Sequence, residues 1–174
     1  MKATEFDGDL EKFLAEYCYQ PELTKRLDLL RHKSFSQETI NEIVLWKVNR
    51  YVRIDNSALQ ELENLKKLKA GEHKDSISVL PSLLEIRGID LPMASTILRF
   101  LNPMVFQIID RHAYRAIYGQ DYPLNSTSAP ERKTRVYFDY LDQLIYLCQN
   151  KSLDFQTIDR LLYMFDKRTN GKLS

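Results

Sequence analysis

The chain has 174 residues and is 44% hydrophobic, with only five glycines and six prolines. This length suits one domain, or two small lobes that share a core, and the composition disfavours both a disordered chain and a β-rich chain with many turns. The formal net charge is +1, from 25 basic and 24 acidic residues, so the overall charge gives no support for nucleic-acid binding.

Cysteine content and hydropathy indicate a reducing, aqueous compartment. Cys18 and Cys148 lie in segments with helical patterns, where buried free thiols are favoured over a disulfide. A closely spaced cysteine quartet for an iron–sulfur cluster is absent, and we expect no metal and no cofactor. The sequence has no signal-peptide pattern and no apolar run of roughly 18 residues, so we expect a cytoplasmic protein with no membrane contact.

In the first part of the chain, apolar residues recur at helical spacing in separate segments. One segment runs from about Leu10 to Tyr19, and Pro21 begins a second, short helix. Ser36 is predicted to cap the next helix. The segment Asp55–Ser57 is predicted to cap another, which Gly71 ends.

The rest of the chain continues the helical pattern. Asp75 or Ser76 is predicted to begin a helix, whereas Gln120–Arg132 is the longest irregular segment. Apolar residues between Tyr137 and Leu147 mark a long helix, and Asp154 is predicted to cap the last one. We find no alternating strand pattern, so the predicted fold is all-α, with about eight to ten short helices.

The stretch from Leu83 to Leu101 is predicted to form two helices joined by a tight turn. Gly88 lies where the first helix must stop, and Pro92 suits the first turn of the second. Backbone N–H groups at the start of a helix have no internal acceptors, so this turn is suited to binding a phosphate oxygen. Arg87, beside the turn, would add a charge-assisted contact.

The hairpin and the segment after it resemble a known family. The matching hairpin positions are Leu83, Ile86, Gly88, Ile89, Asp90, Ala94, Ile97 and Leu98. They resemble the helix-hairpin-helix motif of the base-excision DNA glycosylases, the endonuclease III superfamily. Phe106–His112 is similar to the V-D-x-H segment that follows the hairpin in that family, and the family's essential aspartate matches Asp110. Weaker resemblance extends to Val44–Arg50 and Thr157–Tyr163, as in small relatives of these enzymes.

Two hairpin positions depart from the family pattern. Asp90 replaces the second hairpin glycine, which places a carboxylate where a phosphate would approach. Pro92 occupies the position of the lysine that forms a Schiff base in bifunctional members, which argues against β-lyase chemistry. The cysteine quartet of several members is also missing. The resemblance therefore implies a monofunctional branch without an iron–sulfur cluster.

The resemblance implies a single all-helical, glycosylase-like domain over residues 1–174, with the hairpin at 83–101. The protein would bind double-stranded DNA and would therefore be associated with the nucleoid. Its reaction would be cleavage of an N-glycosidic bond by Asp110. The predicted DNA-binding residues are Arg87, Gly88, Ile89, Asp90, Leu91, Pro92, Met93, Lys47 and Arg50. The predicted pocket residues are Trp46, Arg111 and His112.

Each of these assignments has a structural alternative. Asp110 would cap the following helix whether or not it is catalytic. Lys47 and Arg50 also suit a solvated helix face, and Trp46 suits a core position. The alternative for the whole chain is a catalytically inactive fold relative that binds nucleic acid or another protein. Three features favour this alternative: Asp90, the missing lysine and the near-zero net charge.

Overall fold

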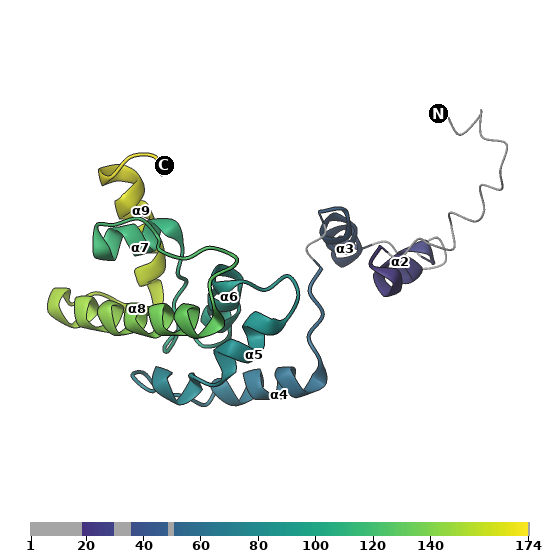
Figure 1. The fold of residues 1–174 in the computed structure, drawn as a ribbon, viewed down its shortest axis with the longest axis horizontal. Helices are drawn as coiled ribbons and strands as arrows, with labels where there is room; N and C mark the ends of the chain where they lie inside the picture. The colour runs from purple at the N-terminus through teal and green to yellow at the C-terminus, as the bar shows by residue number, and fades with distance from the viewer. Residues whose placement is uncertain (1–18, 30–35, 49–50, 174) are drawn as a thin grey trace. The chain divides into compact units, whose positions relative to one another are not determined.

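A computed structural model describes residues 19–29, 36–48 and 51–173, and the regular elements in these ranges are all helical (Figure 1). The predicted all-α class is therefore confirmed for the described residues. The chain divides into two compact units, Met1–Tyr51 and Val52–Ser174. The single glycosylase-like domain over residues 1–174 stays a prediction.

The first unit contains α2 (Pro21–Asp28) and α3 (Gln37–Lys47). Pro21 begins α2 as predicted, and the Ser36 hydroxyl caps α3 by accepting a hydrogen bond from the Thr39 amide at 3.3 Å. The helix predicted from about Leu10 and the thiol of Cys18 lie outside the described residues.

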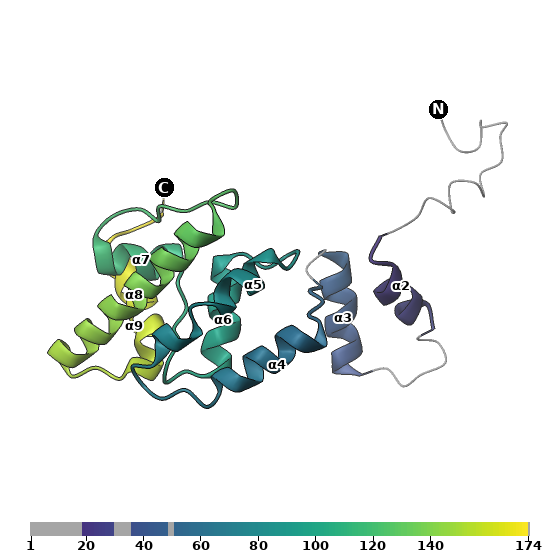
Figure 2. The same ribbon diagram turned by 60° about the horizontal axis from the view of Figure 1, so that its bottom comes forward.

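In the second unit, residues 52–173 form six α-helices and two 3₁₀-helices, which Figures 1 and 2 show from two directions. In chain order they are α4 (Asn56–Leu65), η3 (His73–Ser76), α5 (Val79–Glu85), α6 (Leu91–Leu101), α7 (Arg111–Tyr118), α8 (Pro130–Lys151), η4 (Phe155–Thr157) and α9 (Ile158–Thr169). The predicted hairpin is confirmed as α5 and α6, and α7 packs against α9.

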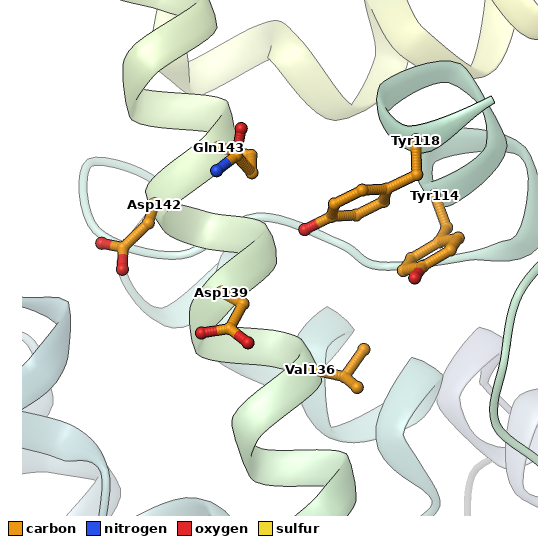
Figure 3. A pocket seen from close by; sticks show the side chains of 6 residues that line it. All are labelled: Tyr114, Tyr118, Val136, Asp139, Asp142 and Gln143. Carbon is orange, nitrogen blue, oxygen red and sulfur yellow. The ribbon is translucent and has the colours of Figure 1, made fainter. Parts of the chain in front are cut away.

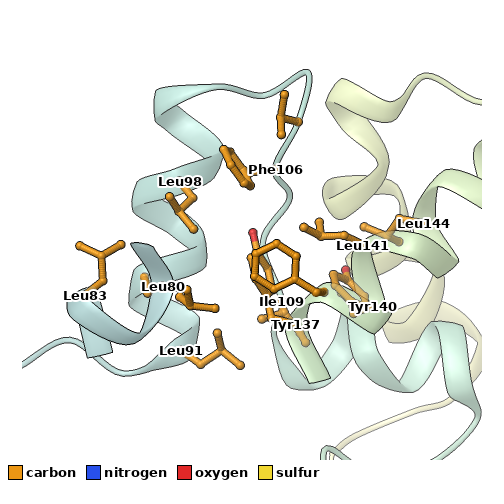
Figure 4. Close-up of a cluster of buried hydrophobic side chains, with 14 of the residues drawn as sticks. Leu80, Leu83, Leu91, Leu98, Phe106, Ile109, Tyr137, Tyr140, Leu141 and Leu144 are labelled. Atoms are coloured by element: carbon orange, nitrogen blue, oxygen red, sulfur yellow. The ribbon is translucent and has the colours of Figure 1, made fainter. Parts of the chain in front are cut away.

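The core of the second unit forms around α8, its longest helix. Tyr137, Tyr140, Leu141 and Leu144 are fully buried on one side of α8. They meet buried side chains from α5, α6 and the segment that precedes α7 (Figure 4). Burial of this apolar area is the main favourable contribution to the stability of the unit.

The start of α4 is predicted correctly, and its end is not. The Asp55 carboxylate caps α4 by accepting from the Ala58 amide at 2.8 Å. The helix ends at Leu65 and not at Gly71, because the chain tightens there into 3₁₀-type turns. The side-chain amide of Asn102 donates to the carbonyl oxygens of Leu65 and Leu68, at 3.0 Å each, where the chain leaves the helix.

Three other predicted boundaries are corrected. Asp75 and Ser76 lie in η3, where the Ser76 hydroxyl donates to the His73 carbonyl at 2.6 Å, and α5 begins only after them. Asp154 caps η4, by accepting from the Gln156 amide at 3.0 Å, and α9 follows that short turn. The irregular segment ends before Pro130, because proline occupies the first turn of α8.

Replacing Asn102 with alanine is expected to lower the free energy of unfolding by about 1–3 kcal/mol, because the carbonyl groups of Leu65 and Leu68 would each lose a hydrogen bond from a buried amide. Urea denaturation followed by far-UV circular dichroism measures this change. Asn150→Ala, at an exposed position in the last turn of α8, is the control and should change stability by less than about 0.5 kcal/mol. Equal effects of the two substitutions would contradict the role given to Asn102.

Two further features of the described residues are the state of Cys148 and the hydropathy of the helices. Cys148 is free and buried, and burial raises the pKa of its thiol. Among the described helices, none combines the length and the apolar character that a membrane crossing requires.

Candidate functional site

Asp110 is the N-cap of α7. Its backbone is extended, and its carboxylate accepts a hydrogen bond from the Ala113 amide at 2.7 Å. The predicted capping role is therefore confirmed. This hydrogen bond fixes the carboxylate at the head of α7.

The backbone before Asp110 is anchored by three hydroxyl groups. The Tyr137 hydroxyl donates to the Gln107 carbonyl and the Tyr140 hydroxyl to the Ile108 carbonyl, both at 3.0 Å. The Ser95 hydroxyl, on α6, accepts from the Ile109 amide at 3.2 Å. Asp110 thus follows a segment that is fixed to both α6 and α8, which restricts where its carboxylate can lie.

A pocket of about 330 Å³ opens beside Asp110. Its lining residues are Ile108, Asp110, Asp159, Arg160, Tyr163 and Met164. The pocket therefore combines two carboxylates with an aromatic ring, a thioether and one guanidinium group. Asp159 is buried and lies 3.5 Å from the guanidinium of Arg99, which is also buried, so its charge is compensated from inside the protein.

His112 lies near Asp110 but faces a different partner. Its Nδ1 lies 2.7 Å from the carboxylate of Asp166 on α9, and its ring meets Tyr163 edge-on, with 4.9 Å between ring centroids. It lines a neighbouring cavity of about 440 Å³ together with Lys167, Gly171, Lys172 and Leu173. Arg111 is exposed and lines neither this cavity nor the Asp110 pocket.

Asp166 is the charged centre of the α7–α9 contact. Its side chain is completely buried and accepts two hydrogen bonds from Arg115, at 2.9 and 2.8 Å, and one from Asn170 at 2.7 Å. The hydrogen bonds from Arg115, with those from Asn170 and His112, hold the pKa of Asp166 well below its usual range. This arrangement fixes α7, and with it Asp110, against α9.

The hairpin turn has the expected backbone, but its own carboxylate occupies the start of α6. Gly88 adopts a φ of +93°, and the Asp90 carboxylate accepts from the Leu91 amide at 2.7 Å. The same carboxylate pairs with the buried ammonium of Lys133 at 2.7 Å, so its negative charge is compensated. Because Pro92 has no N–H, the amide of Met93 is what remains in the first turn for an external acceptor.

The hairpin residues differ in their exposure to solvent. Arg87, Gly88, Pro92 and Met93 are exposed, whereas the side chains of Ile89 and Leu91 are buried in the core. The Ile89 amide also donates to the Ile86 carbonyl at 3.0 Å. Among the predicted hairpin contacts, an external ligand therefore meets mainly Arg87, Gly88 and Met93.

The other predicted residues belong to the first unit. The Trp46 indole donates to the Thr24 hydroxyl at 2.8 Å, and the Tyr19 ring meets it edge-on, with 5.2 Å between centroids. Trp46 therefore packs α3 against α2, as its structural alternative predicted. Lys47 is exposed at the end of α3, and Arg50 lies outside the described residues.

Sequence reasoning did not identify several residues of this region. Asp159, Arg160 and Met164 in the pocket, and Lys167 and Lys172 beside it, come from α9 and the turn after it. The spacing of residues 160, 163, 164 and 167 on one helix face was the available signal. Over the described ranges, no group of three or more histidine, cysteine, aspartate or glutamate residues is placed to hold a metal ion.

Comparisons with known proteins give no match: no family model matches the sequence, and no curated protein or solved structure is significantly similar to the chain.

Proposed function

We propose that this protein binds double-stranded DNA and releases a base by monofunctional cleavage of an N-glycosidic bond, with Asp110 as the catalytic carboxylate. The observation that carries the proposal is the position of Asp110, which is anchored at the head of α7 and lines a pocket with Tyr163 and Met164. An aromatic ring and apolar side chains beside a carboxylate suit a base that has been flipped out of a duplex.

The chemistry assigned to Asp110 follows from its charge. When an N-glycosidic bond breaks, positive charge develops on the sugar, and an ionised carboxylate stabilises that charge or accepts a proton from the attacking water. The cap hydrogen bond from Ala113 holds the carboxylate in place before substrate arrives. Pro92 supports a monofunctional reaction, because no lysine occupies the hairpin position from which bifunctional relatives form a Schiff base.

Phosphate contacts are assigned to two places in the second unit. Arg87 and the Met93 amide are available at the hairpin, where Lys133 compensates the charge of Asp90. Lys167, on α9, and Lys172, after the end of that helix, line the cavity next to the Asp110 pocket. Cations beside the pocket would hold the backbone of the strand whose base is extruded.

The double substitution Lys167→Ala/Lys172→Ala is expected to weaken duplex binding about tenfold near 0.1 M salt, because about two phosphate contacts would be lost. The slope of log affinity against log salt should fall by about two. Fluorescence anisotropy with a labelled duplex measures both quantities. The control is Lys67→Ala/Lys69→Ala, on the exposed surface after α4. Duplex binding that does not depend on salt, or an equal loss in the control, would contradict this assignment.

A second function is favoured by the cap of α6. The Asp90 carboxylate accepts the hydrogen bond of the Leu91 amide, and Pro92 has no N–H to donate. The hairpin therefore offers fewer amides to a phosphate than its sequence pattern implies. This observation favours a fold relative that binds nucleic acid or a protein without catalysis. Duplex binding without release of any base would distinguish this module from the enzyme.

A further inference from the structure

A third cavity, of about 360 Å³, lies between α7 and α8 in the unit that contains Asp110. Its lining residues are Tyr114, Tyr118, Val136, Asp139, Asp142 and Gln143 (Figure 3). Two tyrosines and two aspartates thus meet in one cavity whose lining has no lysine or arginine. The proposed DNA chemistry makes no use of any of these residues.

The α7 side of the cavity is an aromatic wall. The rings of Tyr114 and Tyr118 lie with centroids 4.4 Å apart and planes tilted by 34°, and Tyr122 meets Tyr114 edge-on at 5.5 Å. The hydroxyl of Tyr118 points toward α8 (Figure 3). Burial raises the pKa of Tyr118 to about 12, so its hydroxyl stays protonated at neutral pH. Electron-rich aromatic faces of this kind attract cations.

The α8 side of the cavity carries two carboxylates, those of Asp142 and Asp139, and they differ in whether a cation compensates their charge. The side chain of Asp142 extends away from the tyrosines in Figure 3, and its oxygens lie 2.9 Å from both the Lys74 ammonium and the His73 Nε2. Asp139, one turn earlier, has no ion-pair partner among the described residues. Its negative charge is therefore available to a ligand in the cavity.

We propose that this cavity binds an organic cation, an ammonium or guanidinium group that lies against the rings of Tyr114 and Tyr118 and pairs with the carboxylate of Asp139. The amide oxygen of Gln143 is a further acceptor on the same wall. Aromatic faces and a carboxylate together select positive charge, whereas a phosphate or another anion would be repelled. The cation is the side chain of a lysine or arginine in a partner protein, or a free polyamine.

Calorimetric titration of the full chain tests this inference with three probes: Nα-acetyl-arginine amide, spermidine and the uncharged isostere Nα-acetyl-citrulline amide. The two cations should bind saturably, and the citrulline probe should not. Tighter binding of the arginine probe identifies a protein side chain as the natural ligand, and tighter binding of spermidine identifies a free polyamine. Equal binding of the citrulline and arginine probes would overturn the proposal.

Substitutions locate the binding in this cavity. Asp139→Asn, at an exposed position, should raise the dissociation constant of the cations at least about fivefold. Tyr118→Leu should weaken binding by a similar factor, and Tyr118→Phe, which keeps the ring, should retain it. Asp75→Asn removes an exposed carboxylate outside the cavity and is the matched control. If Asp139→Asn binds like the wild type, or if Asp75→Asn has the same effect, the proposal fails whatever the outcome for DNA.

Discussion

Replacing Asp166 with alanine is expected to lower the free energy of unfolding by about 3–5 kcal/mol, because the largely buried Arg115 guanidinium would lose its carboxylate partner and keep only the carbonyl oxygens of Gly171 and Lys172. Asn170 and His112 would also lose their hydrogen bonds to the carboxylate. The α7–α9 contact should loosen first. Urea denaturation measures the change, followed by far-UV circular dichroism, because the single tryptophan, Trp46, reports on the first unit.

The control for this substitution is Glu61→Ala, at an exposed position on α4, which should change stability by less than about 0.5 kcal/mol. A loss below about 1 kcal/mol for Asp166→Ala would show that the buried carboxylate is not the charged centre of the contact.

The same carboxylate makes stability depend on pH. Since the pKa of Asp166 is lower in the folded than in the unfolded chain, its contribution is fully present above the unfolded value, about pH 4, and is lost as the pH falls below it. The wild type should therefore lose stability between about pH 4 and pH 2 more steeply than Asp166→Asn does. Parallel curves for the two proteins would contradict the lowered pKa.

Leu141→Ala is expected to lower the free energy of unfolding by about 2–5 kcal/mol, because the fully buried leucine on α8 would leave a cavity in the centre of the core. Leu161→Ala, on α9, removes the same atoms from a side chain that is 43% exposed, and should cost less than about 1 kcal/mol. The two denaturation midpoints, measured in the same buffer, give the comparison. Similar losses would mean that α8 does not form the core described above.

Several helix starts were predicted correctly, whereas the end of α4 was not. Ser36, Asp55 and Asp110 all cap helices as predicted, because an N-cap depends on a side chain and an amide three residues apart. The end of α4 depends instead on Asn102, which is distant in sequence and donates to two carbonyls at that end. No local pattern reports such a contact.

The candidate site was predicted only where it is local in the sequence. Asp110 and the turn at Gly88 were found from short-range spacing. The partner of Asp90 was not, because Lys133 comes from α8 and is brought to the hairpin by tertiary packing. For the same reason, the pairing of His112 with Asp166 on α9 was not predicted.

Catalysis by Asp110 is tested by measuring base release from a panel of duplexes. The duplexes would carry oxidised, alkylated, deaminated or mismatched bases, and alkali would convert the abasic sites left by a monofunctional enzyme into strand breaks. Wild type and Asp110→Asn are compared, since asparagine caps a helix about as well as aspartate does. Asp55→Asn, which alters the cap of α4, is the matched control.

We expect the wild type and Asp55→Asn to release at least one of these bases, and Asp110→Asn to do so at least about a hundredfold more slowly. Equal release by the wild type and Asp110→Asn, or duplex binding by the wild type without release of any base in the panel, would contradict this expectation.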